Sequence, residues 1–152
     1  MRLSTKGRYA VMAMTDLAAH GADRAVSLAE IAARQQISLP YLEQLFARLR
    51  RGGLVRSVRG PGGGYRLAKR AGETWISEIV LAVDEPIRAT RCGGDAEAGR
   101  GCMATGEQCL THGLWAALGA KIEDYLASVS LDDVIQRRFD GADKPAAPQV
   151  AA

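Results

Sequence analysis

Residues 37–46 read Ile37-Ser38-Leu39-Pro40-Tyr41-Leu42-Glu43-Gln44-Leu45-Phe46, and this stretch decides the fold. Its leucines, Phe46 and the following Leu49 recur at the three- and four-residue intervals that place side chains on one helix face. We therefore expect a helix over residues 39–51, with Ser38 as its cap and Gly52-Gly53 as its end. Polar and basic residues occupy the opposite face.

The preceding segment predicts two further helices. Apolar residues keep helical spacing over residues 5–20, and Gly21 is a natural stop after them. Ser27-Leu28-Ala29-Glu30 has the pattern of a capping box that opens a short second helix. Gln35-Gln36-Ile37 then forms a turn before the helix over 39–51. Two short helices joined by a tight turn are typical of a helix-turn-helix.

A β-hairpin follows the third helix. We expect strands over residues 54–58 and 65–67, because Arg59-Gly60-Pro61-Gly62-Gly63-Gly64 between them cannot lie inside an element. The predicted fold is mainly α with a small β-hairpin. It is a winged helix-turn-helix DNA-binding domain over residues 1–70, combined with a long dimerisation helix in the remainder.

The chemistry of these elements suits duplex DNA. In a helix-turn-helix the second helix enters the major groove, where Gln44 could pair with adenine and Glu43 could accept from cytosine. Arginines at the end of that helix can neutralise phosphates, and Arg59 at the wing tip could enter a minor groove. The candidate DNA-binding residues are Arg2, Lys6, Ser38, Pro40, Tyr41, Glu43, Gln44, Arg48, Arg50, Arg51, Arg59, Gly60 and Gly62.

The charge distribution favours this interpretation over two others. Residues 1–70 hold 13 Lys and Arg against 4 Asp and Glu, whereas residues 71–152 hold 7 against 13. A cationic half suits a polyanion. A helical hairpin that only contacts proteins would not need it. A nucleotide phosphate loop at 60–64 is disfavoured because the Lys-Ser/Thr ending is missing and Pro61 removes an amide donor.

The second half predicts a ligand-binding cysteine loop and dimerisation helices over residues 71–135. An amphipathic helix starts near Ile76 and is stopped by Pro86, and a cysteine loop spans roughly 88–109. Leu110, Leu114, Leu118, Ile122 and Leu126 then form an apolar stripe that suggests a homodimer; the alternative is packing on its own domain. We expect a disordered tail over residues 136–152.

The three cysteines of the chain and one histidine form the pattern Cys92-x9-Cys102-x6-Cys109-x2-His112. Thiolates gathered with an imidazole are ligands for zinc or an iron–sulfur cluster, and spacing alone does not decide between them. The alternative is a set of unrelated thiols and a surface histidine. An odd cysteine count argues against a disulfide framework and favours the reducing cytoplasm. No apolar run reaches the roughly 20 residues of a membrane span.

Several motifs resemble the IscR-type regulators of iron–sulfur cluster assembly. They are the opening ten residues, residues 37–46, Val58 to Tyr65, Asp84-Glu85, Thr90-Arg91-Cys92 and the segment from Cys109 to Trp115. The resemblance covers residues 1 to about 135. The cysteine spacings are longer than is usual in that family, mostly through residues 93–101, and Pro40 replaces the usual polar residue.

The resemblance implies a homodimeric transcription factor, a repressor and activator that binds promoter DNA and carries a 2Fe–2S cluster. Cys92, Cys102, Cys109 and His112 would hold the cluster, which the cluster assembly machinery would supply. Glu43 would tune promoter choice and Arg59 would contact the minor groove. Rival hypotheses are a nitric-oxide- or redox-sensing regulator such as the relative NsrR, and a DNA-binding protein switched by zinc or thiols. An enzyme is disfavoured, because no acid/base or nucleophile set accompanies the candidate ligands. A cluster carrier is disfavoured, because it would not need a cationic amino-terminal half with a recognition helix.

Overall fold

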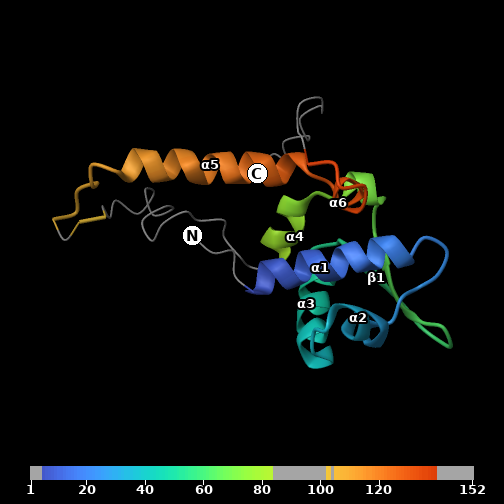
Figure 1. Cartoon of the computed structure of the whole chain (residues 1–152). Helices are drawn as coiled ribbons and strands as arrows, with labels where there is room; N and C mark the ends of the chain where they lie inside the picture. The colour runs from blue at the N-terminus through green and yellow to red at the C-terminus, as the bar shows by residue number, and fades with distance from the viewer. Residues whose placement is uncertain (1–4, 84–101, 104, 140–152) are drawn as a thin grey trace.

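The computed structural model describes residues 5–83, 102–103 and 105–139. In chain order the elements are α1 (Thr5–His20), α2 (Leu28–Gln35), α3 (Leu39–Arg51), β1 (Val55–Val58), β2 (Gly64–Leu67), the 3-10 helix η1 (Ala71–Glu73), α4 (Ile76–Ala82), α5 (His112–Ser128) and α6 (Leu131–Ile135). Helices α2, α3, α4 and α6 gather around α1, and the long helix α5 extends from one side of them (Figure 1).

The helix-turn-helix forms as the sequence predicts. Ser27 begins α2 with a complete capping box, in which its hydroxyl accepts from the Glu30 amide and its own amide donates to the Glu30 carboxylate at 2.9 Å. The turn is made by Gln36, which adopts the left-handed conformation at φ 54°. Ser38 stands at the N-cap of α3, but its side chain makes no capping hydrogen bond.

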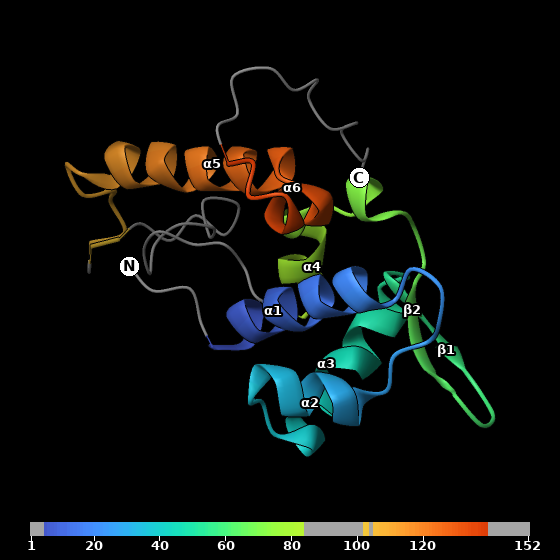
Figure 2. The ribbon, with the colours of Figure 1, turned by 45° about the vertical axis from the view of Figure 1, so that its right-hand side comes forward.

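β1 and β2 form the predicted antiparallel hairpin. Val55 pairs with Leu67, Arg56 with Arg66, Ser57 with Tyr65 and Val58 with Gly64. A bridge between Val26 and Tyr65 joins the hairpin to the segment before α2, through amide-to-carbonyl bonds of 3.0 and 2.8 Å. The hairpin tip lies with α2 and α3 on the side of α1 that faces away from α5 (Figures 1 and 2).

One hydrophobic core joins the winged helix-turn-helix to the later elements. Met14 and Leu17 of α1 pack with Leu42, Phe46 and Leu49 of α3. The same cluster includes Ile79 and Val80 of α4 and Leu131 of α6, all fully buried. Burying these apolar side chains is the main force that holds α4 and α6 against α1.

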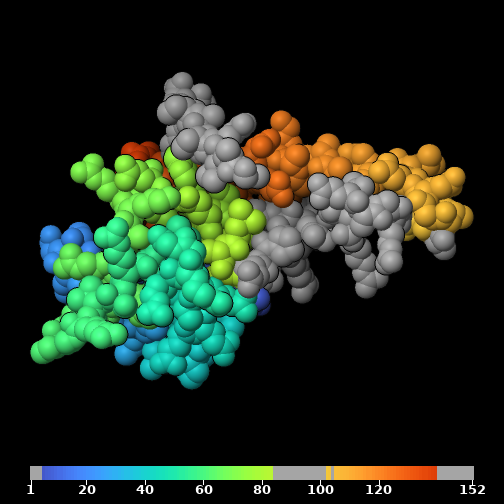
Figure 3. Space-filling view, turned by 180° about the vertical axis from the view of Figure 1, so that it is seen from behind, coloured from blue at the N-terminus to red at the C-terminus, as the bar shows by residue number. Residues whose placement is uncertain are grey.

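The C-terminal end of α5 is fastened to this body. The Ile76 amide donates to the Val129 carbonyl and the Leu131 amide donates to the Thr74 carbonyl, both at 2.9 Å. No residue of α5 is buried, and in the space-filling view the helix projects from one side of the body (Figure 3). Leu114, Trp115 and Tyr125 are 62%, 37% and 47% exposed. No helix in the described ranges is long and apolar enough to cross a membrane.

One local expectation was wrong, one falls outside the described residues and one helix was not foreseen. Leu39 was expected on the buried face of the helix but is 39% exposed, at the first residue of α3. The helix expected from Ile76 forms as α4 and ends at Ala82, and its predicted stop, Pro86, falls outside the described residues. α6 was not anticipated, and its five residues fall within the range expected only to hold dimerisation elements.

Candidate nucleic-acid interface and metal centre

The outward face of α3 is open to solvent. Glu43 and Gln44 are exposed in the second turn of the helix, and their side chains have no hydrogen-bond partner among the described residues. Pro40 at the start of α3 and Arg50 and Arg51 at its end are also exposed. The helix therefore presents polar groups near its N-terminus and cations at its C-terminus, where cations are favoured by the helix dipole.

Two of the candidate DNA-binding residues are engaged within the protein. Tyr41 is half-buried, and its ring meets Tyr9 of α1 edge-on with centroids 5.9 Å apart. Arg48 is half-buried, and its Nη1 donates to the Val83 carbonyl at 3.5 Å. These contacts fix α3 against α1 and against the end of α4, so both residues position the recognition helix whatever else they bind.

A buried ion pair positions α2 against α1. Asp16 of α1 accepts from Arg34 Nη2 and from Gln35 Nε2, both at 2.7 Å. Burial alone would raise the pKa of Asp16, but the hydrogen bonds from Arg34 and Gln35 and the Arg34 charge outweigh it and lower that pKa. The sequence signal for this pair was an acidic residue, Asp16, on the apolar side of a predicted helix, and its partner was not identified.

Glycines in left-handed conformations form the tip of the wing. Gly60 and Gly62 take φ values of +98° and +75°, which favour glycine, and the Gly63 amide closes the turn on the Gly60 carbonyl at 2.9 Å. Arg59 is exposed beside them. Lys6 lies half-buried in the first turn of α1, and Arg2 is outside the described residues.

Cys102 contacts both of the other candidate metal ligands that the structure describes, His112 and Cys109. Cys102 Sγ lies 3.0 Å from His112 Nδ1, although ten residues separate them in the chain. Cys109 precedes α5 instead of lying in its first turn, and its carbonyl accepts from the His112 amide at 3.0 Å. Hydrogen bonds with Thr111 and with Cys102 lower the pKa of the Cys109 thiol. Cys92 lies outside the described residues.

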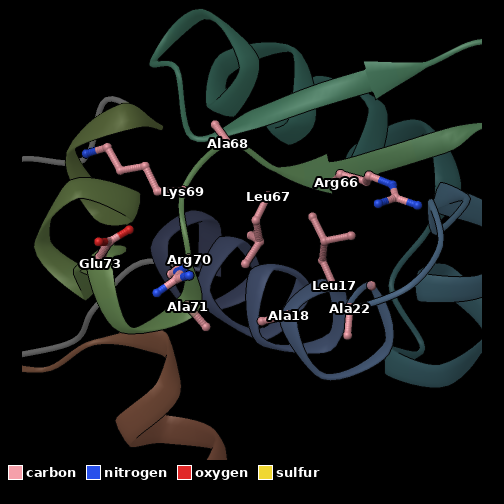
Figure 4. Close-up of a pocket in the computed structure, with 11 residues that line it drawn as sticks. Leu17, Ala18, Ala22, Arg66, Leu67, Ala68, Lys69, Arg70, Ala71 and Glu73 are labelled. Atoms are coloured by element: carbon pink, nitrogen blue, oxygen red, sulfur yellow. The ribbon is translucent and has the colours of Figure 1, made fainter.

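A pocket of about 570 Å³ lies between the end of α1 and the segment after β2, away from the candidate metal ligands (Figure 4). Leu17, Ala18 and Leu67 line it together with charged side chains of both signs. Arg66 at its edge extends beside the loop after α1 and donates to the Asp23 carbonyl at 2.9 Å. None of the candidate site residues lines this pocket.

Three helices with an exposed polar α3 and a glycine-rich wing define a DNA-binding protein of the winged helix-turn-helix class. The sequence matches the Rrf2 family, described as iron-dependent transcriptional regulators, over residues 3–137. The chain belongs to this family of regulators, and its relatives are transcription factors, not enzymes.

Individual relatives are similar over most of their length. The chain is 51% identical over 146 residues to the HTH-type transcriptional regulator IscR of Xenorhabdus nematophila, which covers 95% of this chain and 86% of that protein. It is 53% identical over 138 residues to IscR of Photorhabdus laumondii, covering 91% and 81%. These similarities make it a DNA-binding regulator of the IscR type.

Solved structures agree with the fold. The T. potens IscR structure superposes with a TM-score of 0.72 at 35% identity and covers 96% of this chain and 94% of that one. CymR, the global cysteine regulator of B. subtilis, superposes with a TM-score of 0.74 at 31% identity, covering 90% and 98%.

Proposed function

We propose that this regulator senses a 2Fe–2S cluster held by Cys92, Cys102, Cys109 and His112, and controls iron–sulfur biogenesis genes accordingly. The observation that carries the proposal is the 3.0 Å approach of Cys102 Sγ to His112 Nδ1 at the start of α5. The description of the family as iron-dependent and the IscR name of its relatives support the same assignment.

The described donors suit such a group. Cys102 and Cys109 are free thiols, both half-buried, and one imidazole stands beside them. Thiolate and imidazole together can hold iron in a cluster, and an imidazole ligand adds no negative charge. When bound, the cluster would supply a reversible, redox-sensitive centre at this position. The residues themselves must lose protons to bind it, so occupancy should fall in acid.

The proposed assembly is a homodimer formed through α5. Leu114, Leu118, Ile122 and Tyr125 lie along one side of α5, and none of them is buried in the described chain. Pairing two such helices would remove apolar surface from water. A dimer would also present two copies of α3 to operator half-sites about one helical turn, roughly 34–36 Å, apart.

The proposed setting is the cytoplasm, where the cluster assembly machinery would load the site. His112 is the first residue of α5, and α5 is fastened at its other end to the segment around Thr74. Cluster binding would therefore act on the placement of α5 and, through the shared core, on α3.

Glu43 and Gln44 would read bases, Glu43 would tune promoter choice, and Arg59 would enter the minor groove.

The test is anaerobic purification followed by visible absorption and by iron, sulfide and zinc analysis. Binding of a biogenesis-gene operator is then measured with the holo and apo forms. His112→Ala should lose the cluster and the cluster-dependent difference in affinity. His20→Ala is the matched control, because His20 is the other histidine of the chain and lies exposed at the end of α1.

A colourless, zinc-loaded protein would overturn the cluster assignment and support the zinc- or thiol-switched alternative. Equal operator affinity of holo and apo protein at every promoter would overturn sensing. Loss of the difference in His20→Ala as well as in His112→Ala would remove the specific role of His112.

A further inference from the structure

Two arginines face each other across the wing. Arg56 of β1 and Arg66 of β2 are directly paired in the antiparallel register, and both are exposed. Directly opposed residues in such a ladder have Cβ atoms about 4.5–5.5 Å apart. Their guanidinium groups therefore share one face of a hairpin only four residues long in each strand.

This face is the outer one. The neighbouring pairs, Val55 with Leu67 and Ser57 with Tyr65, alternate with it along the strands. Leu67 and Tyr65 turn toward the body: Leu67 packs on the core, and the Tyr65 ring lies 4.9 Å from that of Phe46. Arg56 and Arg66 consequently belong to the side of the wing that faces solvent.

Neither charge is neutralised within the described protein. Arg66 donates to the Asp23 backbone carbonyl at 2.9 Å, which uses a donor but cancels no charge. Among the described residues, Arg56 has no hydrogen-bond or ion-pair partner, and no carboxylate pairs with either guanidinium. Other arginines do find carboxylates, as Arg24 does with Glu30 at 2.7 Å.

Like charges placed directly opposite on a sheet are destabilising. An anion bound between the two arginines would replace their repulsion with attraction. The two parallel N–H donors of a guanidinium group match the oxygens of a phosphate. The pair lies on the hairpin that carries Arg59, three residues beyond Arg56, and its tip is on the side of α2 and α3 (Figure 2). The anion that approaches this side is duplex DNA.

We propose that Arg56 and Arg66 form a phosphate clamp on the outer face of the wing, separate from base reading by α3 and from Arg59 at the tip. The clamp rests on the proposed DNA-binding surface and extends it to the strands. It holds the backbone that flanks the groove entered by the wing, so it adds affinity without adding sequence preference.

The test is the salt dependence of DNA affinity of Arg56→Ser/Arg66→Ser, on an operator and on an unrelated duplex. Each lost phosphate contact should lower the slope of log K against log salt by about 0.9. The variant should therefore lose between about 0.9 and 1.8 in slope for each bound wing, and about twice that for the proposed dimer with both wings on the duplex. The ratio of operator to unrelated affinity should stay that of the unmodified protein.

The control is Arg70→Ser/Arg137→Ser, which removes the same charge beside η1 and after α6, two elements that pack together away from the wing. Its slope should stay unchanged. Arg56→Lys/Arg66→Lys should keep most of the slope, since lysine also neutralises phosphates. Arg56→Ser alone should melt at the same or a higher temperature than the unmodified protein, which shows that the fold survives.

An unchanged slope in Arg56→Ser/Arg66→Ser would overturn the clamp, as would an equal fall in the control. A fall in the operator-to-unrelated ratio would assign the pair to base reading instead. Failure of the proposed function is a separate result: the unmodified protein would then show no cluster-dependent operator binding, whatever the variants do.

Discussion

The Asp16 carboxylate receives hydrogen bonds from Arg34 and Gln35, and it thereby ties the first helix of the winged domain to the helix before the recognition helix. The Asp16 side chain is fully buried, whereas the Arg34 side chain is 31% exposed. Removal of Asp16 therefore leaves an arginine that can still reach water. The cost should lie at the low end of the range for broken buried pairs.

Asp16→Asn should lower the free energy of unfolding at neutral pH by about 3 kcal/mol, measured by urea denaturation. Because the folded pKa of Asp16 lies below its ordinary 3.8, its stabilisation is present above about pH 4 and disappears as pH falls through the folded value. The variant should thus show a shallower loss of stability in acid. Asp23→Asn, at an exposed position, should change neither quantity.

Glu30 also contributes to the loss of folding stability at low pH. Hydrogen bonds from Arg24 and Ser27 lower the pKa of Glu30 to about 2. Its contribution survives Asp16→Asn, so the variant should retain part of the pH dependence. A variant as steep as the unmodified protein between pH 4 and 2 would contradict the role given to Asp16.

Gln36 holds a backbone conformation that suits glycine. It ends α2 at φ 54°, and its amide donates to the Ala32 carbonyl. Gln36→Gly should raise the free energy of unfolding by up to about 1 kcal/mol, because glycine takes this conformation without a Cβ clash. Ala33→Gly, in the exposed interior of α2, should lower it by about 1 kcal/mol. Thermal and urea melts of both variants check the opposite signs.

At the scale of elements, the hairpin depends on Gly64 at its junction with the body. Its φ is +152°, and an added Cβ would collide with the carbonyl of Val26, which accepts from the Tyr65 amide. Gly64→Ala should destabilise the protein by about 1–3 kcal/mol and weaken DNA binding, because the wing loses its anchor. Gly72→Ala should be neutral, since its Cβ would meet nothing closer than 4.0 Å.

Those measurements are a melting curve and an operator titration for each variant. Wild-type affinity in Gly64→Ala, with normal stability, would show that the bridge to Val26 does not position the wing.

Locally encoded elements could be predicted from the sequence. The ends of α1 and α3 and the capping box of α2 follow from apolar spacing and caps, and they match the expected residues. The bridge between Trp75 and Ser130 was missed because it joins segments more than 50 residues apart. α6 was missed although its capping box, Ser130 with Asp133, is a local signal. Leu39 was misassigned because apolar spacing alone does not distinguish the exposed first turn of α3 from its buried middle.

Parts of the candidate site could likewise be predicted from local sequence, whereas others depend on contacts between distant segments. The exposed side chains of α3 and the wing follow from helix and turn patterns. The approach of Cys102 to His112 could be anticipated as a pattern but not as a distance, since loop geometry decides it. The paired Arg56 and Arg66 could not be anticipated, because strand register is set by the turn and by the core-facing residues.

For the whole molecule, the proposed dimer should depend on the exposed stripe of α5. Leu114 is 62% exposed, so Leu114→Glu should leave the fold intact while it places a charge in the interface. Sedimentation should show a shift from dimer to monomer, with loss of at least tenfold in operator affinity. Ala120→Glu, on the opposite side of α5 and also exposed, should remain dimeric.

A monomeric unmodified protein, or dimers of equal strength for both variants, would contradict the role of the stripe. Circular dichroism of each variant checks that α5 is still helical.

The attachment of α5 at Val129–Leu131 makes this helix a lever with its pivot at the C-terminal end. Its 17 residues span roughly 25 Å at 1.5 Å per residue. A tilt of about 10° at the pivot would therefore displace the His112 end by roughly 4 Å. In the opposite direction, a shift of several ångströms at His112 reaches the pivot, beside Thr74 and Ile76, as a small rotation that close-packed side chains must absorb. A displacement of several ångströms near the thiols therefore produces only a small rotation in the core that carries α3.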